Sequence, residues 1–337
     1  MKNNKPTSLD LFAGCGGLTL GFEMAGVNCV ACNEIDKHAC ATLRTNKPSW
    51  NLIEGDVCSI SFKRFQGEID IVTGGFPCQS FSTNGKQLGL EDARGTMFYQ
   101  FARAIDEVRP KIAVGENVHG LLSHDNGKTL EIMLSVLDSI GYKVEQPYLL
   151  KATDYDVPQK RNRLFIIAIR KDLDIKFVVP EKSKKQRTMR DALKAGDLFA
   201  TDVPSSQGAS YSEARKKVLE LVSPGGCWRD LPLETQKSYL KKCFHNGGGN
   251  SGIAKRLSWD DPCLTLMCSP IQKQTERCHP DETRPLTIRE YARIQTFPDS
   301  YTFCGSIANQ YKQIGNAVPV NLAMAVGKSV VDILGTI

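Results

Sequence analysis

The 337-residue sequence lacks any apolar run that approaches the roughly 18 residues needed to cross a membrane. Its first ten residues also lack the charged, apolar and small-residue regions of a secretory signal. No internal repeat is evident, and 41% hydrophobic with 24% charged residues is close to a globular average. These absences argue against membrane, collagen-like and coiled-coil proteins. We therefore expect a soluble cytoplasmic protein that has no membrane partner.

Metal-binding and disulfide patterns are missing too, although the chain has 12 cysteines. Cys29 and Cys32 form the only CxxC pair, and no second pair follows at zinc-finger spacing. Further on, Cys263, Cys268 and Cys278 are irregularly spaced. Because a reducing compartment keeps thiols free, we expect mostly buried, reduced cysteines and no metal.

The length exceeds the roughly 100 to 200 residues of one ordinary domain, which favours two domains or one large domain with an insertion. The first 170 residues alternate apolar strand-like segments with amphipathic helical ones. Strands are expected at residues 8–12, 28–33, 69–73, 112–115 and 164–169, and helices at 20–25, 97–108 and 129–140. This alternation predicts a parallel sheet covered by helices, with ligands at the carboxyl ends of the strands.

After about Val179 the pattern gives way to a basic stretch and a region rich in Gly, Ser and Pro. Residues 181–256 hold 15 Lys and Arg against 8 Asp and Glu, so their +7 exceeds the +6 of the whole chain. On charge alone, an ordinary solvated surface and a face that binds a polyanion are both consistent. Helical patterning returns at 287–296 and from Val320 to the end.

A glycine turn follows the first expected strand and precedes a helix. Gly14, Gly16 and Gly17 allow a tight turn and a close approach to a ligand, but Thr19 stands where a dinucleotide fingerprint has its third glycine. Glu34 ends the second strand, where a carboxylate can accept both hydroxyls of a ribose, and Asp56 follows a third strand-like segment. The pattern favours an adenosine site without a phosphate cradle over a structural turn with incidental acids.

Four further polar side chains lie near the expected strand ends. Cys78 follows the strand at 69–73 in a turn that Pro77 stiffens, a placement that favours a nucleophile over a core thiol. Glu116 comes directly after the strand at 112–115; helix capping explains its neighbour Asn but not Glu. Arg161 and Arg163 alternate before the last strand and should project to one side, although plain surface arginines remain an alternative.

Taken together, these motifs resemble those of the bacterial cytosine-5 DNA methyltransferases over nearly the full length of the chain. Their joint order and spacing carry the resemblance. The matching segments are 10–17 (DLFAGCGG), Glu34, 55–56 (GD), 75–82 (GFPCQSFS), 94–95 (RG), 116–118 (ENV), 159–163 (QKRNR), 284–299 (RPLTIREYARIQTFPD) and 313–319 (QIGNAVP).

The resemblance implies an α/β fold, namely a methyltransferase-type, Rossmann-like, mostly parallel sheet with a smaller irregular target-recognition domain. We expect a catalytic, cofactor-binding domain over 1–178 plus 311–337, and a target-recognition domain and hinge over 179–310. The implied methyl donor is S-adenosylmethionine. Its expected site comprises Phe12 on the adenine, Glu34 on the ribose, Asp56 on the adenine amino group, Asn316 beside the methionine part, and Gly14, Gly16, Gly17 and Pro77.

The resemblance also assigns the catalytic residues. The Cys78 thiolate attacks C6 of a flipped-out cytosine, because C5 is by itself a poor nucleophile. Glu116 protonates N3, Arg163 binds the base's carbonyl oxygen, and Arg161 supports the site. The expected substrate is double-stranded DNA, bound by a monomer that belongs to a restriction-modification system with a separately acting endonuclease.

Two features depart from the family's pattern. Phe76 stands where many members have proline, and a phenylalanine stiffens the nucleophile turn less than a proline does. The tRNA-directed branch has a Cys-Phe-Thr signature, whereas this chain has Cys243, Phe244 and His245, followed by glycines that could approach a DNA backbone or form a connector. A tRNA methyltransferase, a nicotinamide-dependent oxidoreductase and a non-catalytic DNA-binding regulator remain the alternatives. The target sequence lies beyond what one sequence predicts.

Overall fold

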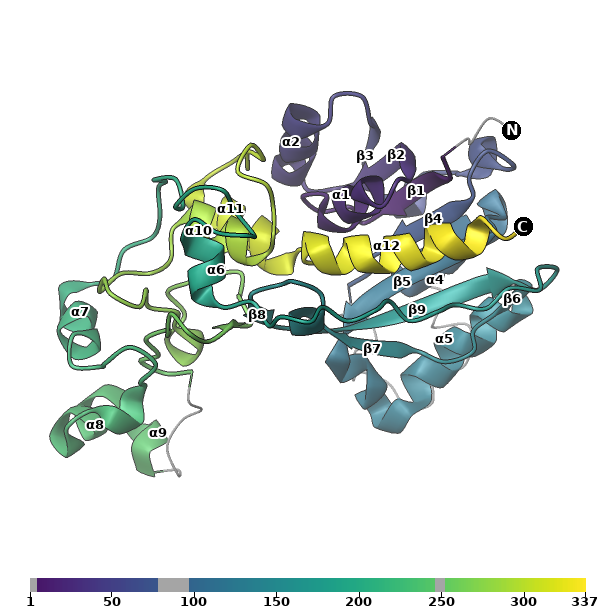
Figure 1. Cartoon of the computed structure of the whole chain (residues 1–337). Coiled ribbons are helices and arrows are strands. Elements are labelled where there is room, and N and C mark those ends of the chain that lie inside the picture. The colour runs from purple at the N-terminus through teal and green to yellow at the C-terminus, as the bar shows by residue number, and fades with distance from the viewer. Residues whose placement is uncertain (1–4, 78–96, 246–251) are drawn as a thin grey trace. The chain divides into compact units, whose positions relative to one another are not determined.

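The computed structural model describes residues 5–77, 97–245 and 252–337 (Figure 1). The chain divides into two compact units. Unit 1 comprises Met1–Lys151, Asn162–Lys182 and Val318–Ile337, and unit 2 comprises Ala152–Arg161 and Ser183–Ala317. The expected boundaries at 178 and 311 differ from this division, because residues 152–161 and 311–317 belong to unit 2.

Unit 1 is built on a mixed sheet, whose strand order in the described residues is β3-β2-β1-β4-β5-β9-β6, with β7 also paired to β9. The first five strands in this order are mutually parallel. The strands are β1 Thr7–Leu11, β2 Asn28–Glu34, β3 Asn51–Glu54, β4 Ile71–Gly74, β5 Ile112–Val118, β6 Tyr142–Lys143, β7 Tyr148–Lys151 and β9 Asn162–Arg170.

Strand β9 departs from the parallel sheet that the strand and helix alternation predicted, within a sheet that is mostly parallel, as the resemblance implied. It runs antiparallel to β5, from Ile112 opposite Ile169 to Val118 opposite Arg163, and also antiparallel to β6 and β7. Both β5 and β9 are buried along most of their length, so their near-continuous apolar residues fit either direction. The pattern alone therefore could not show which way β9 runs.

Helices cover the sheet of unit 1. They are α1 Gly17–Met24, α2 Lys37–Asn46, α4 Met97–Val108, α5 Lys128–Ser139 and α12 Val320–Leu334. Side chains of α4 and α5 share one apolar core with the strands, including Phe98, Phe101 and Met133. Figure 1 shows α12, from the end of the chain, lying alongside α1. Glycines make this approach close, since a Cβ on Gly327 would lie 2.9 Å from that of Ala25.

The C-terminal segment 307–334 is long and apolar enough to cross a membrane by length and composition alone, with a mean hydropathy of 1.5. It consists of two helices, and 61% of its most apolar window is buried within the protein. A core helix of a soluble protein passes the same test, and this burial fits α12 as a core helix.

Unit 2 has little regular structure. Its helices are α6 Met189–Leu193, α7 Glu213–Leu219, α8 Leu233–Leu240, α9 Lys242–His245, α10 Ile288–Ile294 and α11 Ile307–Asn316, and its strands β8 Gln159–Lys160 and β10 Cys263–Leu264 pair in parallel. Short 3-10 turns complete both units: Val57–Ser59, Lys63–Phe65, His119–Leu122, His124–Gly127, Ala152–Asp154, Trp228–Asp230 and Lys273–Thr275. The helix expected at 287–296 is α10, which Thr287 and Glu290 open as a capping box.

Buried arginines bind the main chain of this irregular unit. Arg256 donates to the carbonyl oxygens of Val222 and Leu219, at 2.7 and 2.8 Å. Arg293, fully buried, donates to Asp299 through two nitrogens and to the carbonyl oxygen of Thr201. Buried carbonyls need a donor, and loops without helical or sheet partners obtain one from such side chains.

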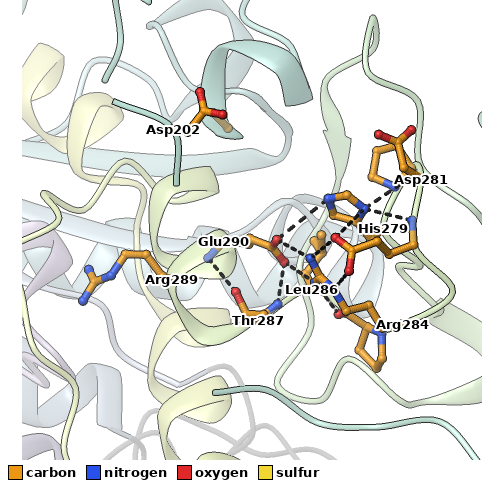
Figure 2. A network of polar contacts seen from close by, with 12 residues as sticks. Asp202, His279, Asp281, Arg284, Leu286, Thr287, Arg289 and Glu290 are labelled. Atoms are coloured by element: carbon orange, nitrogen blue, oxygen red, sulfur yellow. Dashed lines mark hydrogen bonds and ion pairs between the residues drawn. The ribbon is translucent and has the colours of Figure 1, made fainter. Parts of the chain in front are cut away.

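A second polar network, which includes the buried His279 and Glu290, holds the start of α10 (Figure 2). Glu290 accepts two hydrogen bonds from Arg284, both 2.8 Å, and one from the Thr287 amide. The His279 Nδ1 accepts from the Asp281 amide, so that ring nitrogen carries no proton. Burial lowers the pKa of His279, consistent with a neutral ring. The network forms part of the wall of a cavity of about 600 Å³.

Candidate active site

The turn after β1 adopts backbone conformations that require its glycines. Gly14 and Gly16 have φ of 54° and 86°, and the helix α1 begins at Gly17. Phe12, a bulky residue, also has a positive φ of 57°. Such a conformation in a non-glycine residue costs about 1–3 kcal/mol and is concentrated at functional sites. The half-buried ring of Phe12 is thus held at the carboxyl end of β1 by a strained backbone.

Main-chain amides fix Glu34 in position at the end of β2. Its Oε2 accepts from the Gly14 amide at 2.7 Å, and its Oε1 accepts from the amides of Ile35 and Asp36 at 2.9 and 2.8 Å. Each carboxylate oxygen can accept about two hydrogen bonds, so Oε2 keeps capacity for a ligand hydroxyl. The structure therefore brings Glu34 and the glycine turn together, as the sequence predicted.

Asp56 follows β3 and is exposed, capping the turn Val57–Ser59 through a 2.9 Å bond from the Cys58 amide. Asn33 of β2 donates to the carbonyl oxygens of Ile53 and Gly55, which ties the ends of β2 and β3 together. Ile35, directly after Glu34, is 65% exposed. An exposed apolar side chain beside Glu34 was not identified from the sequence, because a lone isoleucine carries no motif.

The segment that leads to Cys78 is anchored in the core, whereas Cys78 itself lies outside the described residues, as do 94–95. The Phe76 ring is 3% exposed and packs on Phe98 and Phe101 of α4, with ring centroids 5.3 and 5.5 Å apart. Asn117 donates to the Phe76 carbonyl oxygen at 3.0 Å. Phe76 thus supplies by packing the restraint that a proline would supply by stiffness. Pro77 is exposed.

Glu116 and Arg163 form a buried ion pair at the carboxyl edge of β5. The Arg163 Nε lies 2.6 Å from the Glu116 Oε1, and both side chains are about one-tenth exposed. Burial lowers the pKa of Arg163, while Glu116 opposes that shift. Contrary to the expectation that Glu116 follows the strand, it lies within β5, because pairing with β9 extends β5 to Val118.

Glu116 also borders the nucleophile segment. A Cβ built on Gly75 would lie 3.1 Å from the Glu116 Oε2, so this position has room only for glycine or for a small shift of the carboxylate. Asn117, next in sequence, holds Phe76. The end of β5 therefore contacts the Gly75–Phe76 backbone through two successive side chains.

The remaining two predicted residues belong to unit 2. Arg161 is 3% exposed and donates to the carbonyl oxygens of Leu266 and Gly315, at 3.2 and 2.8 Å. Asn316, at the end of α11, accepts a hydrogen bond from the Cys268 thiol. Arg161 and Arg163 thus have different partners. The two arginines were expected to project to one side, but they do not share a binding role. The Arg161 contacts indicate a role in joining α11 to the 266–268 segment.

The described residues include no group of three or more His, Cys, Asp or Glu side chains that could hold a metal ion. Among the cysteines whose side chains the structure describes, none is linked by a disulfide bond.

This sheet order, with its antiparallel strand β9 and a C-terminal helix packed on α1, defines the chain as an α/β protein of the methyltransferase type. Comparison with known proteins agrees with that class and narrows it. The family model described as "C-5 cytosine-specific DNA methylase" matches residues 7–332. The chain therefore belongs to the C-5 cytosine-specific DNA methylase family, and it is an enzyme.

Curated relatives are similar over the whole chain. A protein named Type II methyltransferase M.Eco47II, from Escherichia coli, is 56% identical over 100% of this chain and 81% of its own length. Type II methyltransferase M.PspPI, from Psychrobacter sp., is 55% identical over 97% of this chain and 79% of its own. A solved structure described as a "putative DNA modification methyltransferase encoded within prophage", from E. coli, has a similar fold, with a TM-score of 0.76, 23% identity and coverage of 98% of this chain and 99% of that chain.

Proposed function

We propose that this chain transfers a methyl group from S-adenosylmethionine to C5 of a cytosine in duplex DNA, through a covalent adduct with Cys78. The observation that carries the proposal is the buried Glu116–Arg163 pair, which borders the Gly75–Phe76 backbone two residues before Cys78. An acid and a cation at that place are the groups that an addition to a cytosine ring requires.

The residues at the ends of β1, β2 and β3 fit an adenosine-containing methyl donor. Glu34 retains an acceptor position for a ribose hydroxyl, Asp56 is exposed for an adenine amino group, and the ring of Phe12 provides an apolar contact. Thr19 in place of a third glycine suits a cofactor that has no phosphates. When bound, the sulfonium of this cofactor supplies the methyl group. Gly14, Gly16, Gly17, Pro77 and Asn316 complete the proposed binding set.

In the proposed reaction, residues of this chain supply the nucleophile, the proton donor and the cation. The Cys78 thiolate adds to C6, and the electrons of the C5–C6 double bond move to C5, which takes up the methyl group. Glu116 supplies a proton to N3, and Arg163 binds the ring carbonyl oxygen, where negative charge develops. Loss of the C5 proton then expels Cys78 and restores the double bond. Since the thiolate approaches the ring face, the cytosine must leave the base stack. Arg161, bound to main-chain carbonyls, has a supporting role.

Unit 2 is the proposed target-recognition domain, and several cations of its basic stretch are held in ion pairs. Lys185, Arg187 and Lys194 each form an ion pair with a nearby aspartate. Exposed lysines at Lys241 and Lys242 are better placed to contact phosphates, which would give affinity that falls with salt. Given its Type II relatives, we infer that the protein modifies DNA as a monomer in a restriction-modification system, alongside a separately acting endonuclease.

The direct test measures methyl transfer from labelled S-adenosylmethionine to unmethylated duplex DNA and, in parallel, to tRNA. We expect label on C5 of DNA cytosine, none on tRNA, and no transfer by Cys78→Ala. The matched control is Cys304→Ala, which removes a half-buried thiol from unit 2 and should leave transfer unchanged. Full activity of Cys78→Ala would refute the covalent mechanism, and label on tRNA alone would refute the DNA substrate.

A further inference from the structure

A carboxylate that the proposed reaction does not use is buried near the carboxyl end of β1. Asp10 is 0% exposed, and its Oδ1 accepts from the Thr73 hydroxyl at 2.5 Å. Its Oδ2 accepts from the Thr19 hydroxyl. Both threonines are themselves buried. All three belong to unit 1, so their geometry is set by one sheet and the helix that follows its first strand.

The two hydroxyls come from the two halves of the proposed site. Thr19 lies in the first turn of α1, directly after the glycine turn that Glu34 holds. Thr73 lies in β4, opposite Asp10 in the parallel register, and is followed by the Gly74–Phe76 segment. One carboxylate thus bonds to the cofactor turn on one side and to the strand that leads to Cys78 on the other.

A buried charge at this place is costly, which argues against a purely incidental role. Burial raises the pKa of Asp10 to about 6, the hydrogen bonds from Thr19 and Thr73 oppose that shift, and Glu34 adds to it. Glu34 and Cys29, both on β2, are titratable groups that interact with it electrostatically. An apolar residue would avoid the desolvation cost but could not bind two hydroxyls at once.

We propose that Asp10 is a positioning residue, which holds the cofactor turn and the nucleophile-bearing strand at a fixed distance from one another. It acts through Thr19 and Thr73 and touches no substrate. The inference rests on the proposed function, because it assigns the Thr19 hydrogen bond to the methyl-donor site and the Thr73 hydrogen bond to the strand that leads to Cys78. It also explains Thr19, which takes the place of a glycine in order to supply a hydroxyl.

The test removes one hydroxyl at a time in the full-length protein. Thr19→Val should weaken binding of S-adenosylmethionine about tenfold by calorimetry, since a hydrogen bond to a charged group is lost beside the turn. Thr73→Val should keep that affinity and lower the single-turnover rate of methyl transfer about tenfold. Thr129→Val is the control, because it removes a buried hydroxyl that bonds His124 at the start of α5. Equal effects of all three variants would overturn the proposal.

A second variant keeps the shape of the Asp10 side chain and removes its negative charge. Asp10→Asn can accept from only one threonine, so it should remain folded but bind S-adenosylmethionine more weakly than wild type at pH 7.5. Between pH 7.5 and 5.5 the wild-type affinity should fall, since a protonated carboxyl can no longer accept at both oxygens, while that of Asp10→Asn should change less. Identical pH profiles would overturn the role of the carboxylate. If wild type itself binds no S-adenosylmethionine, the proposed function fails instead, so the two failures are distinguishable.

Discussion

Phe76→Ala tests how the core sets the position of the nucleophile. The Phe76 ring is 3% exposed, fills the space between Phe98 and Phe101, and lies against Gly115, where a Cβ would be 3.2 Å from the ring. Removing a buried phenylalanine ring costs about 3–5 kcal/mol. The backbone of residue 76 keeps its bond from Asn117. A shift of about 1 Å at a reacting group lowers a rate by about 100-fold, which is the loss of methyl transfer that we expect.

Two measurements separate position from stability. Urea unfolding gives the stability loss, and single-turnover methyl transfer at saturating cofactor and DNA gives the rate. Phe76→Leu, which roughly keeps the volume, should cost less than about 1.5 kcal/mol and retain most of the rate. Phe303→Ala is the matched control, because Phe303 is 6% exposed and packs on Phe297 and Tyr301 in unit 2. A Phe76→Ala rate equal to wild type, or an equal rate loss in Phe303→Ala, would refute the reasoning.

Four further outcomes follow from the structure. Glu116→Gln should bind S-adenosylmethionine normally in calorimetry yet lose at least about 100-fold in methyl transfer, and a wild-type rate would contradict its role in protonating N3. Replacing Lys241 and Lys242 by alanine should lower the slope of log affinity against log salt by about 2 on non-specific DNA, whereas an unchanged slope would remove them from the interface. Arg293→Ala should lower the free energy of unfolding by about 3 kcal/mol in urea, because Asp299 and several carbonyl oxygens lose their hydrogen-bond donor. The control is Arg190→Ala, at an exposed arginine, which should cost less than about 1 kcal/mol. Burial raises the folded-state pKa of Asp10 to about 6, so the folded protein takes up a proton there before the unfolded chain does as the pH falls. Lowering the pH from 7 to 4 should therefore stabilise wild type relative to Asp10→Asn by up to about 3 kcal/mol in unfolding free energy. A constant difference between the two would contradict the raised pKa.

Local patterns predicted the elements whose burial is one-sided or continuous. The helix expected at 97–108 is α4 with those bounds, since its apolar face packs on the sheet at helical spacing. The strands β1, β2, β4 and β5 were located to within a few residues. The direction of β9 was not, because it depends on pairing with β5, β6 and β7, and an apolar run reads the same in both directions.

Site residues were predictable where the chain itself brings them together. Glu34 meets Gly14 because β1 and β2 are adjacent parallel strands whose ends coincide. The partners of Arg161, by contrast, lie more than 100 residues further along the chain, so a spacing of two residues could not separate it from Arg163. The role of Thr19 was hidden for the same reason, since only the fold shows that Asp10 and Thr73 face its hydroxyl.

The central claim is that this chain makes 5-methylcytosine in DNA through Cys78. It is tested most directly by expressing the chain in a host that has no DNA methylation and mapping modified bases across the host genome. The account predicts 5-methylcytosine at one short recurring sequence in cells with the wild-type chain, and none in cells with Cys78→Ala. Methylation of adenine or of the cytosine amino group, or an unmodified genome in cells that contain folded wild-type protein, would contradict it.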